Sequence, residues 1–231
     1  MSEITLTPDE KIYDILLDGL KIIQNKNGFK YGTDAVLLAE FVKLKKGDSV
    51  LDFCSGSGII PLILHSKHKA EEIIGIEIDK NVSDTALKTV ELNGLQGKVD
   101  FICGDIKNAS KILKRSFDVI TCNPPYSKSG SGKVSESKSI ATARYELECT
   151  LDDVCKNAAK VLKFGGRFYM VHKAERVADV IFNMKKYNLE PKEMQLVYTK
   201  KDATAKLVLI CAVLGAGVQV NVLPPKLIGE N

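Results

Sequence analysis

The chain has 231 residues, of which 45% are hydrophobic and 27% are charged. This composition is that of an ordinary folded domain, and it excludes a disordered chain, a collagen-like repeat and a coiled coil. Lys and Arg number 33 against 29 Asp and Glu, so the net charge is +4. Such a mild excess permits an anionic partner such as RNA without requiring one.

No apolar run approaches the roughly 18–20 residues that span a bilayer, and the first residues do not resemble a signal peptide. His65 and His68 have no third ligand nearby in the sequence, so we expect no metal. The six cysteines form no Cys-x-x-Cys pair, and we expect them to be reduced core residues of a cytoplasmic protein. They are Cys54, Cys103, Cys122, Cys149, Cys155 and Cys211.

The N-terminal part predicts a hairpin and a helix. Two β-rich runs flank Asp18-Gly19 within residues 13–25, and Asp-Gly favours a type I′ turn. Thr33 is a predicted N-cap of the helix that follows. We expect residues 1–47 to pack on a core formed by residues 48–231, within a single domain.

From residue 48 onward, short apolar runs alternate with helical segments. This alternation predicts βαβ units and a parallel sheet covered on both faces. The runs at 194–200 and 205–215 leave no room for a helix between them, so they should be antiparallel neighbours. Five parallel strands are predicted in the runs before this pair, at 48–54, 72–79, 98–105, 117–126 and 166–172. Thr150, with Asp153 three residues on, is the predicted N-cap of the helix before the fifth run, in an imperfect capping box.

The first strand runs into a glycine turn. Gly56 and Gly58 would let the backbone approach a ligand at the start of the next helix. Pro61 stands where the dinucleotide fingerprint has its third glycine, which argues against a nicotinamide enzyme. Glu77 follows Gly56 by 21 positions, a spacing that suits a carboxylate bound to ribose hydroxyls. Asp79 is the rival candidate.

Two further strand ends carry polar groups. Asp105 ends the third run and could accept a hydrogen bond from an adenine amino group, or could cap the next helix. The fourth run ends in Asn-Pro-Pro-Tyr, residues 123–126. Prolines cannot donate to a sheet ladder, so the strand must stop there. The stiff corner should expose an amide, a carbonyl and an aromatic ring at the mouth of a pocket.

These motifs resemble the class I S-adenosylmethionine-dependent methyltransferases that modify a planar amine. Segments at 31–41, 57–64, 74–78, 143–146, 150–172 and 223–225 are similar to the bacterial tRNA1(Val) (adenine(37)-N6)-methyltransferases. The sequence departs from the family pattern at Cys54, where many members have glycine, and at Tyr145, where many have histidine. The resemblance implies a Rossmann-like α/β fold with a seven-stranded, mostly parallel sheet whose last strand is antiparallel.

The resemblance also implies site residues. Asn123, Pro124, Pro125 and Tyr126 would bind and orient the target amine, with Tyr126 stacked on the base. The residues expected to bind S-adenosylmethionine are Gly32, Thr33, Asp52, Cys54, Gly56, Gly58, Glu77, Ile78, Asp105, Ile106 and Asn123. Residues 31–34 would close over the methionine end, or Thr33 would only cap its helix.

The implied partner is tRNA, with no membrane partner. Lys128, Lys133 and Lys138 lie in a Ser/Gly-rich loop after Tyr126, and they could contact phosphates, as could Lys173 and Arg176. Plain solvated surface is the alternative for all five. Other hypotheses are methylation of an rRNA or DNA base or of a protein glutamine, a nicotinamide oxidoreductase, and an inactive binding module. The sequence alone leaves the oligomeric state open.

Overall fold

The computed structural model describes residues 4–15, 17–26, 31–68, 70, 72–125 and 149–228. A two-stranded hairpin and a nine-stranded sheet contain all of its strands. In chain order, the elements are β1 (Glu10–Asp14), β2 (Lys21–Asn25), α1 (Thr33–Phe41), β3 (Ser49–Phe53), α2 (Ile59–His68), β4 (Glu72–Glu77), α3 (Lys80–Leu92), β5 (Val99–Cys103), η1 (Ile106–Asn108), α4 (Ala109–Leu113), β6 (Phe117–Cys122), α6 (Leu151–Val161), β7 (Leu162–Lys173), η2 (Ala174–Arg176), α7 (Val177–Lys186), β8 (Leu189–Tyr198), β9 (Leu207–Leu214), β10 (Asn221–Val222) and β11 (Lys226–Leu227).

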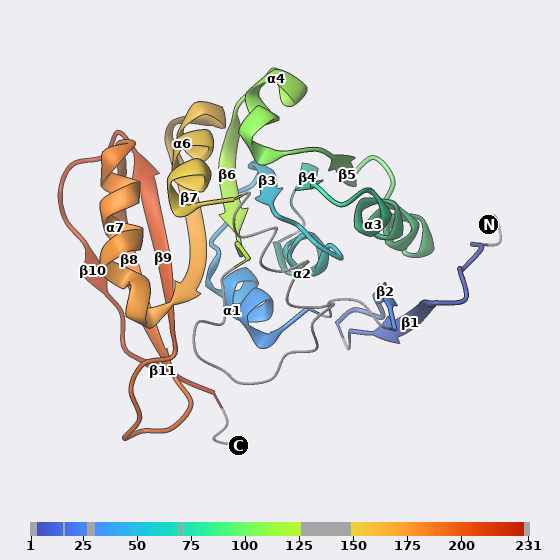
Figure 1. Ribbon diagram of the computed structural model, residues 1–231, viewed down its shortest axis with the longest axis horizontal. Coiled ribbons are helices and arrows are strands. Elements are labelled where there is room, and N and C mark those ends of the chain that lie inside the picture. The colour runs from blue at the N-terminus through green and yellow to red at the C-terminus, as the bar shows by residue number, and fades with distance from the viewer. Residues whose placement is uncertain are drawn as a thin grey trace.

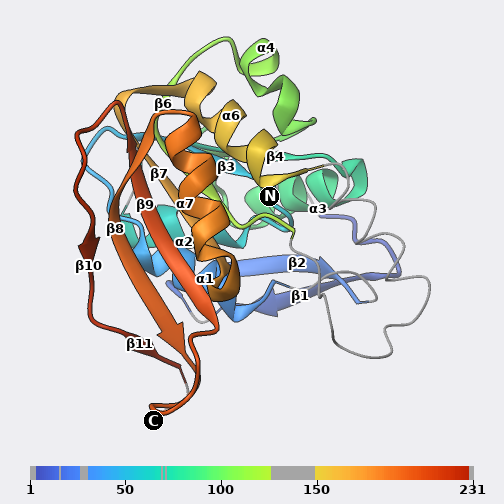
Figure 2. The ribbon, with the colours of Figure 1, turned by 60° about the vertical axis from the view of Figure 1, so that its left-hand side comes forward.

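The seven long strands of the main sheet lie in the order β8-β9-β7-β6-β3-β4-β5. Strand β9 is antiparallel to both β7 and β8, and the other pairings are parallel. The predicted fold class is therefore confirmed: the last of the seven long strands in the sequence, β9, is the antiparallel one. The sequence did not predict β10 and β11, which pair with β8 at the sheet edge and are visible there in Figure 2.

Helices cover both faces of the sheet (Figure 1). Apolar residues of α1, α2 and α3 form one core cluster with one face of the strands. Apolar residues of α4, α6 and α7 form the second cluster with the other face. This layering explains why the central strands are apolar on both faces, as parallel strands in such folds are. None of the helices in the described ranges is long and apolar enough to cross a membrane.

The predicted N-terminal hairpin is confirmed, although β1 begins earlier than expected. Asp18 and Gly19 both have positive φ, of 50° and 71°, as a type I′ turn requires. Buried Glu10 accepts hydrogen bonds from Thr85 and Lys88 of α3. The Ile23 amide donates to Thr89 of the same helix. These bonds fix the hairpin against α3.

The helix starts were predicted unevenly. Thr150 caps α6 in a reciprocal capping box with Asp153, as expected. The prediction for α1 is wrong, because Gly32 is the N-cap and Thr33 is the first helical residue. No side-chain cap bond forms there, so the start of α1 depends on the packing of its buried face and not on local capping.

Candidate functional site

The predicted site residues follow the carboxyl ends of four neighbouring strands. Phe53 pairs with Cys122 and with Ile76, and Glu77 pairs with Cys103. The register therefore places the residues after β6, β3, β4 and β5 side by side along one edge. Neighbouring strands lie about 4.8 Å apart, so this row of strand ends spans about 14 Å. Ligands bind at this edge in open α/β sheets.

The turn after β3 has the backbone conformation that the glycines predicted. Cys54, Gly56 and Gly58 have φ values of 54°, 54° and 84°. A non-glycine residue at such a φ is uncommon, so the conformation of Cys54 is one that glycine adopts more easily. A Cβ on Gly56 would meet nothing within 4 Å, whereas one on Gly58 would lie 2.4 Å from the Phe101 ring. Gly56 thus faces a space that none of the described residues fills, and Gly58 packs against Phe101 of β5.

A pair of alanine substitutions separates these two roles. Gly58→Ala should destabilise the fold by roughly 2–3 kcal/mol, because it forces Phe101 to move and strains the backbone. Gly56→Ala should cost about 1 kcal/mol yet weaken S-adenosylmethionine binding at least tenfold, since its methyl group enters the open side of the turn. Thermal denaturation and titration calorimetry measure the two effects. Wild-type affinity in folded Gly56→Ala would place the cofactor elsewhere.

Glu77 lies against this turn, as its spacing from Gly56 predicted. Its carboxylate accepts hydrogen bonds from the amides of Gly56 (2.9 Å) and Asp79 (3.0 Å), one on each oxygen. Burial raises the pKa of Glu77. The rival Asp79 is occupied elsewhere, because its side chain caps α3 by accepting from Asn81 and Val82. Each Glu77 oxygen keeps one further acceptor position, so the carboxylate can accept two hydroxyl groups.

Asp52, a predicted cofactor residue, lies in the core directly before the glycine turn. The residue is fully buried, and its carboxylate accepts hydrogen bonds from Ser55 (2.6 Å) and Thr121 (2.5 Å). Asp52 therefore joins the glycine turn to β6 through Thr121, which precedes Asn123 by two residues. The geometry is that of a positioning residue, which holds the two halves of the edge together. Sequence reasoning did not identify Ser55 or Thr121.

The buried carboxyl group of Asp52 gives a testable pH dependence. Burial raises its pKa from 3.8 to about 7. A group with a raised folded-state pKa stabilises fully below its unfolded pKa, and this contribution disappears as the pH rises through about 7. Wild type should therefore lose a few kcal/mol between pH 4 and 7 that the isosteric Asp52→Asn variant does not lose. Urea denaturation across this range measures the difference, and parallel curves for the two proteins would contradict it.

The remaining predicted cofactor residues lie near β4 and β5. Ile78 is 40% exposed directly after Glu77, which leaves an apolar side chain available to a ligand. Asp105 caps η1 by accepting from the Lys107 amide, the alternative that the sequence had left open. Ile106 is buried in the core behind it. A contact of Asp105 with a ligand would use its remaining acceptor positions.

The corner after β6 contains an unsatisfied acceptor. The Oδ1 atom of Asn123 is buried and has no hydrogen-bond partner within the described part of the chain. Pro124 is buried and Pro125 is half-buried. A buried acceptor without a donor costs about 1–3 kcal/mol, so the corner offers an acceptor to a donor from outside the described residues. Tyr126, the predicted stacking residue, lies outside the described residues, as does Tyr145.

Thiols also surround this corner. The Cys54 and Cys149 sulfur atoms are 4.0 Å apart. Contact with Cys122 raises the pKa of Cys54, contact with Cys54 raises that of Cys149, and burial raises that of Cys122. All three thiols are therefore protonated at neutral pH and are poor nucleophiles. The site can orient a substrate, but it does not offer an activated cysteine for covalent catalysis.

The N-terminal segments approach the turn from the other side. Buried Gln24 of β2 donates to Ser57 Oγ across 3.3 Å, a contact that the sequence did not indicate. Gly32 and Thr33 are exposed at the start of α1. Whether residues 31–34 contact a cofactor stays a prediction.

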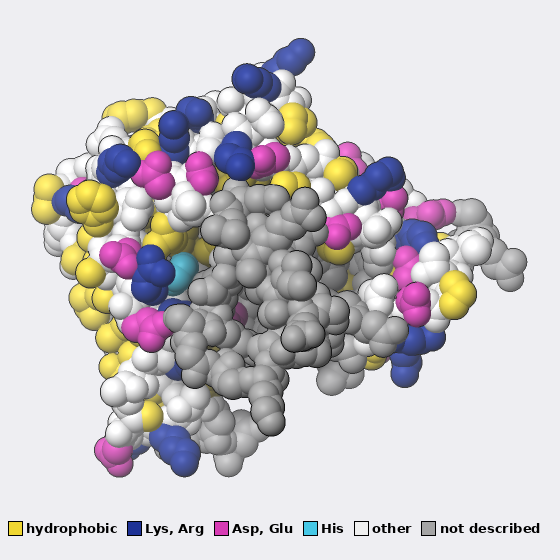
Figure 3. All heavy atoms as spheres, in the orientation of Figure 1, with side chains coloured by type: hydrophobic (Ala, Val, Ile, Leu, Met, Phe, Trp, Pro, Cys, Tyr) yellow, Lys and Arg dark blue, Asp and Glu magenta, His cyan; other side chains and the backbone are white. Residues whose placement is uncertain are grey.

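The two predicted nucleic-acid contacts that lie in the described part of the chain are each paired with an acidic residue. Lys173 pairs with Glu175 and Arg176 with Asp179, although both cations lie at the carboxyl end of β7, beside β6. Figure 3 shows Lys and Arg side chains interspersed with acidic ones over the visible face. Lys128, Lys133 and Lys138 lie outside the described residues.

Known proteins resemble this chain in sequence and in fold. A tRNA1(Val) (adenine(37)-N6)-methyltransferase of Histophilus somni is 28% identical over 151 residues, which is 65% of this chain and 63% of that protein. The enzyme of the same name from Bacteroides fragilis is 28% identical over 189 residues, covering 80% of this chain and 78% of that protein. The alignment with the first relative thus leaves more than a third of that protein unmatched.

Solved structures and family models agree with this resemblance. The crystal structure of a predicted O-methyltransferase from Agrobacterium tumefaciens superimposes with a TM-score of 0.68 at 18% identity, covering 85% of this chain and 88% of that chain. At this identity the likeness shows the fold, which is that of the class I methyltransferases. The model of the methyltransferase small domain matches residues 26–195. The chain belongs to the methyltransferase small domain family.

Proposed function

We propose that this protein transfers the methyl group of S-adenosylmethionine to the exocyclic N6 of an adenosine in tRNA, next to the anticodon. The observation that carries the proposal is the buried Asn123 Oδ1, which has no hydrogen-bond partner among the described residues and lies at the strand end beside the glycine turn. The names of the relatives, which are tRNA adenine-N6 methyltransferases, support the substrate.

The described residues fit the cofactor. Open space beside Gly56, two acceptor positions on Glu77 and the exposed face of Ile78 follow one another along the edge. In this order they would provide a close approach to the backbone, acceptors for the ribose hydroxyls and an apolar contact for the adenine. S-adenosylmethionine supplies a methyl group that is already activated by its sulfonium. The protein therefore has to bind the cofactor and the target amine, orient them toward each other and exclude water.

An exocyclic adenine amine is a weak nucleophile because its lone pair is delocalised into the ring. Asn123 Oδ1 accepts one N–H, and the Pro124 carbonyl accepts the other. The two acceptors draw the nitrogen toward tetrahedral geometry and aim its lone pair at the methyl carbon, while Tyr126 stacks on the flipped base. Acceptors placed where positive charge develops stabilise the transition state.

A second candidate substrate is another planar amine or amide, in rRNA, in DNA or in a protein glutamine. The corner suits each of them, since it recognises the NH2 group and not the molecule that carries it. Adenine in RNA is favoured by the relatives and not by the geometry of Asn123.

The deciding experiment supplies labelled S-adenosylmethionine to an unmodified tRNA transcript and analyses the nucleosides. We expect N6-methyladenosine, and we expect none in a matched transcript with guanosine at position 37. Label in rRNA, DNA or protein with none in tRNA would support the second candidate. No transfer to any of these substrates would refute the assignment.

A further inference from the structure

A cavity lies at the amino ends of the strands, opposite the candidate site at their carboxyl ends. It has a volume of about 490 Å³ and is lined by residues of the hairpin loop, of the end of α2 and of the segments before β4 and β5. Ala70 precedes β4, and Lys98 precedes β5, so the cavity opens at the amino ends of these strands. Methyl transfer at the carboxyl ends does not use it. Its volume is in the range of small-molecule sites.

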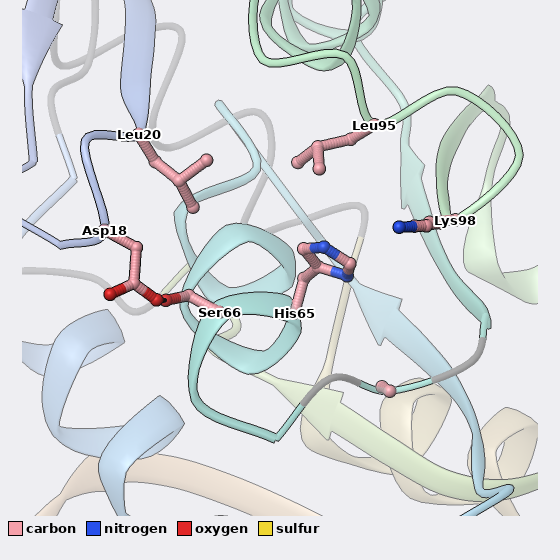
Figure 4. A pocket seen from close by; sticks show the side chains of 7 residues that line it. Asp18, Leu20, His65, Ser66, Leu95 and Lys98 are labelled. Atoms are coloured by element: carbon pink, nitrogen blue, oxygen red, sulfur yellow. Dashed lines mark hydrogen bonds between the residues drawn. The ribbon is translucent and has the colours of Figure 1, made fainter.

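One end of the cavity is basic. Figure 4 shows the Lys98 ammonium group directed toward the imidazole ring of His65. Within the described residues, no carboxylate lies within ion-pair distance of Lys98, and the buried Nδ1 atom of His65 has no hydrogen-bond partner. The Lys98 ammonium group, for which the described residues provide no counter-ion, therefore faces a ring whose Nδ1 has no hydrogen-bond partner among the same residues.

The other walls are apolar or already satisfied. Leu20 and Leu95 project into the cavity in Figure 4, and Ala70 is a further apolar residue of the lining. Asp18 is the acidic residue of the lining, but it accepts a hydrogen bond from Ser66 on the side away from Lys98. In Figure 4, Ser66 and the His65 ring lie between Asp18 and Lys98, so the carboxylate does not face the ammonium group. Such a site has one anchor for charge and a surface for a hydrocarbon or a ring.

We propose that this cavity binds a small organic anion, with a phosphate or carboxylate between Lys98 and His65 and an apolar or aromatic body against Leu20 and Leu95. An anion would provide Lys98 with a counter-charge and His65 Nδ1 with a hydrogen-bond partner. Burial and the charge of Lys98 lower the pKa of His65, against a smaller opposing effect of the Ala70 backbone. A bound anion would reverse this shift.

Phenyl phosphate is a suitable probe, because it combines a phosphate with an aromatic ring. The chain has three histidines, so NMR can follow the His65 imidazole signal directly. We expect phenyl phosphate to shift that signal saturably, with a Kd of about 1 mM or tighter. The pKa of His65 should then rise by about one unit. Saturating S-adenosylhomocysteine keeps the probe out of the methyltransferase site.

Two comparisons make the result decisive. Lys98→Gln should weaken binding at least tenfold, whereas Lys46→Gln removes an exposed charge elsewhere and should leave it unchanged. Inorganic phosphate should bind more weakly than phenyl phosphate, because it lacks the ring. Equal affinity for the two probes would contradict the proposed contact of the ring with Leu20 and Leu95. A signal that does not saturate, or that Lys98→Gln leaves unchanged, would overturn the site.

Discussion

Asn123→Ala should reduce methyl transfer by about 10²–10³-fold, the loss expected when one group that stabilises a transition-state charge is removed. The same substitution should not destabilise the fold. Asn123 Oδ1 has no hydrogen-bond partner within the described residues, so alanine removes a buried acceptor that these residues do not satisfy. We therefore expect an unchanged or slightly higher melting temperature. Single-turnover kinetics and thermal denaturation give the two values.

The control is S-adenosylmethionine affinity, which should stay within about threefold of wild type, because the cofactor contacts assigned to β3 and β4 remain. Asn123→Asp keeps the shape and one acceptor but adds a charge, so it should retain more activity than alanine. If Asn123→Ala turned over at a near-normal rate, the amide would have no role in orienting the amine. If it lost cofactor binding instead, Asn123 would belong to the cofactor site.

The sequence predicted those parts of the fold whose causes are local. The Asp18-Gly19 turn, the Thr150 capping box and the alternation of strands with helices depend on residues within a few positions of one another, and all three are confirmed. The antiparallel placement of β9 followed from the short connection before it. Chain order and connection length were therefore sufficient for the topology.

The contacts that the sequence did not predict join residues far apart in the chain. Asp52 meets Thr121 across 69 positions of the sequence, and Gln24 meets Ser57 across 33. No spacing rule anticipates such pairs, because the sheet register creates them. Strands β10 and β11 are two residues each on either side of Pro224-Pro225, so they have too little pattern to be recognised. The alignment of Glu77 with Gly56 was predictable only because the βαβ unit has a regular length.

Glu77→Ala should weaken the binding of S-adenosylmethionine by about 30–100-fold, the equivalent of roughly 2–3 kcal/mol, because each carboxylate oxygen has an acceptor position available to a ribose hydroxyl. The substitution also removes the acceptor of the Gly56 amide, which should loosen the glycine turn and add to the loss. Titration calorimetry with S-adenosylhomocysteine measures the affinity without turnover. Glu77→Gln should fall between alanine and wild type, since it retains one acceptor oxygen.

Asp79 provides the matched control, because it is the neighbouring acid that the sequence could not distinguish from Glu77. Asp79→Asn keeps a side-chain oxygen that can cap α3 and should bind S-adenosylhomocysteine within about threefold of wild type. A large loss in Asp79→Asn with little change in Glu77→Ala would reverse the assignment. A large loss in both would mean that the turn and the start of α3 hold the ligand together. The contacts of Glu77 with the Gly56 and Asp79 amides favour a large loss of affinity in Glu77→Ala and little change in Asp79→Asn. In that case Glu77, and not Asp79, binds the ribose.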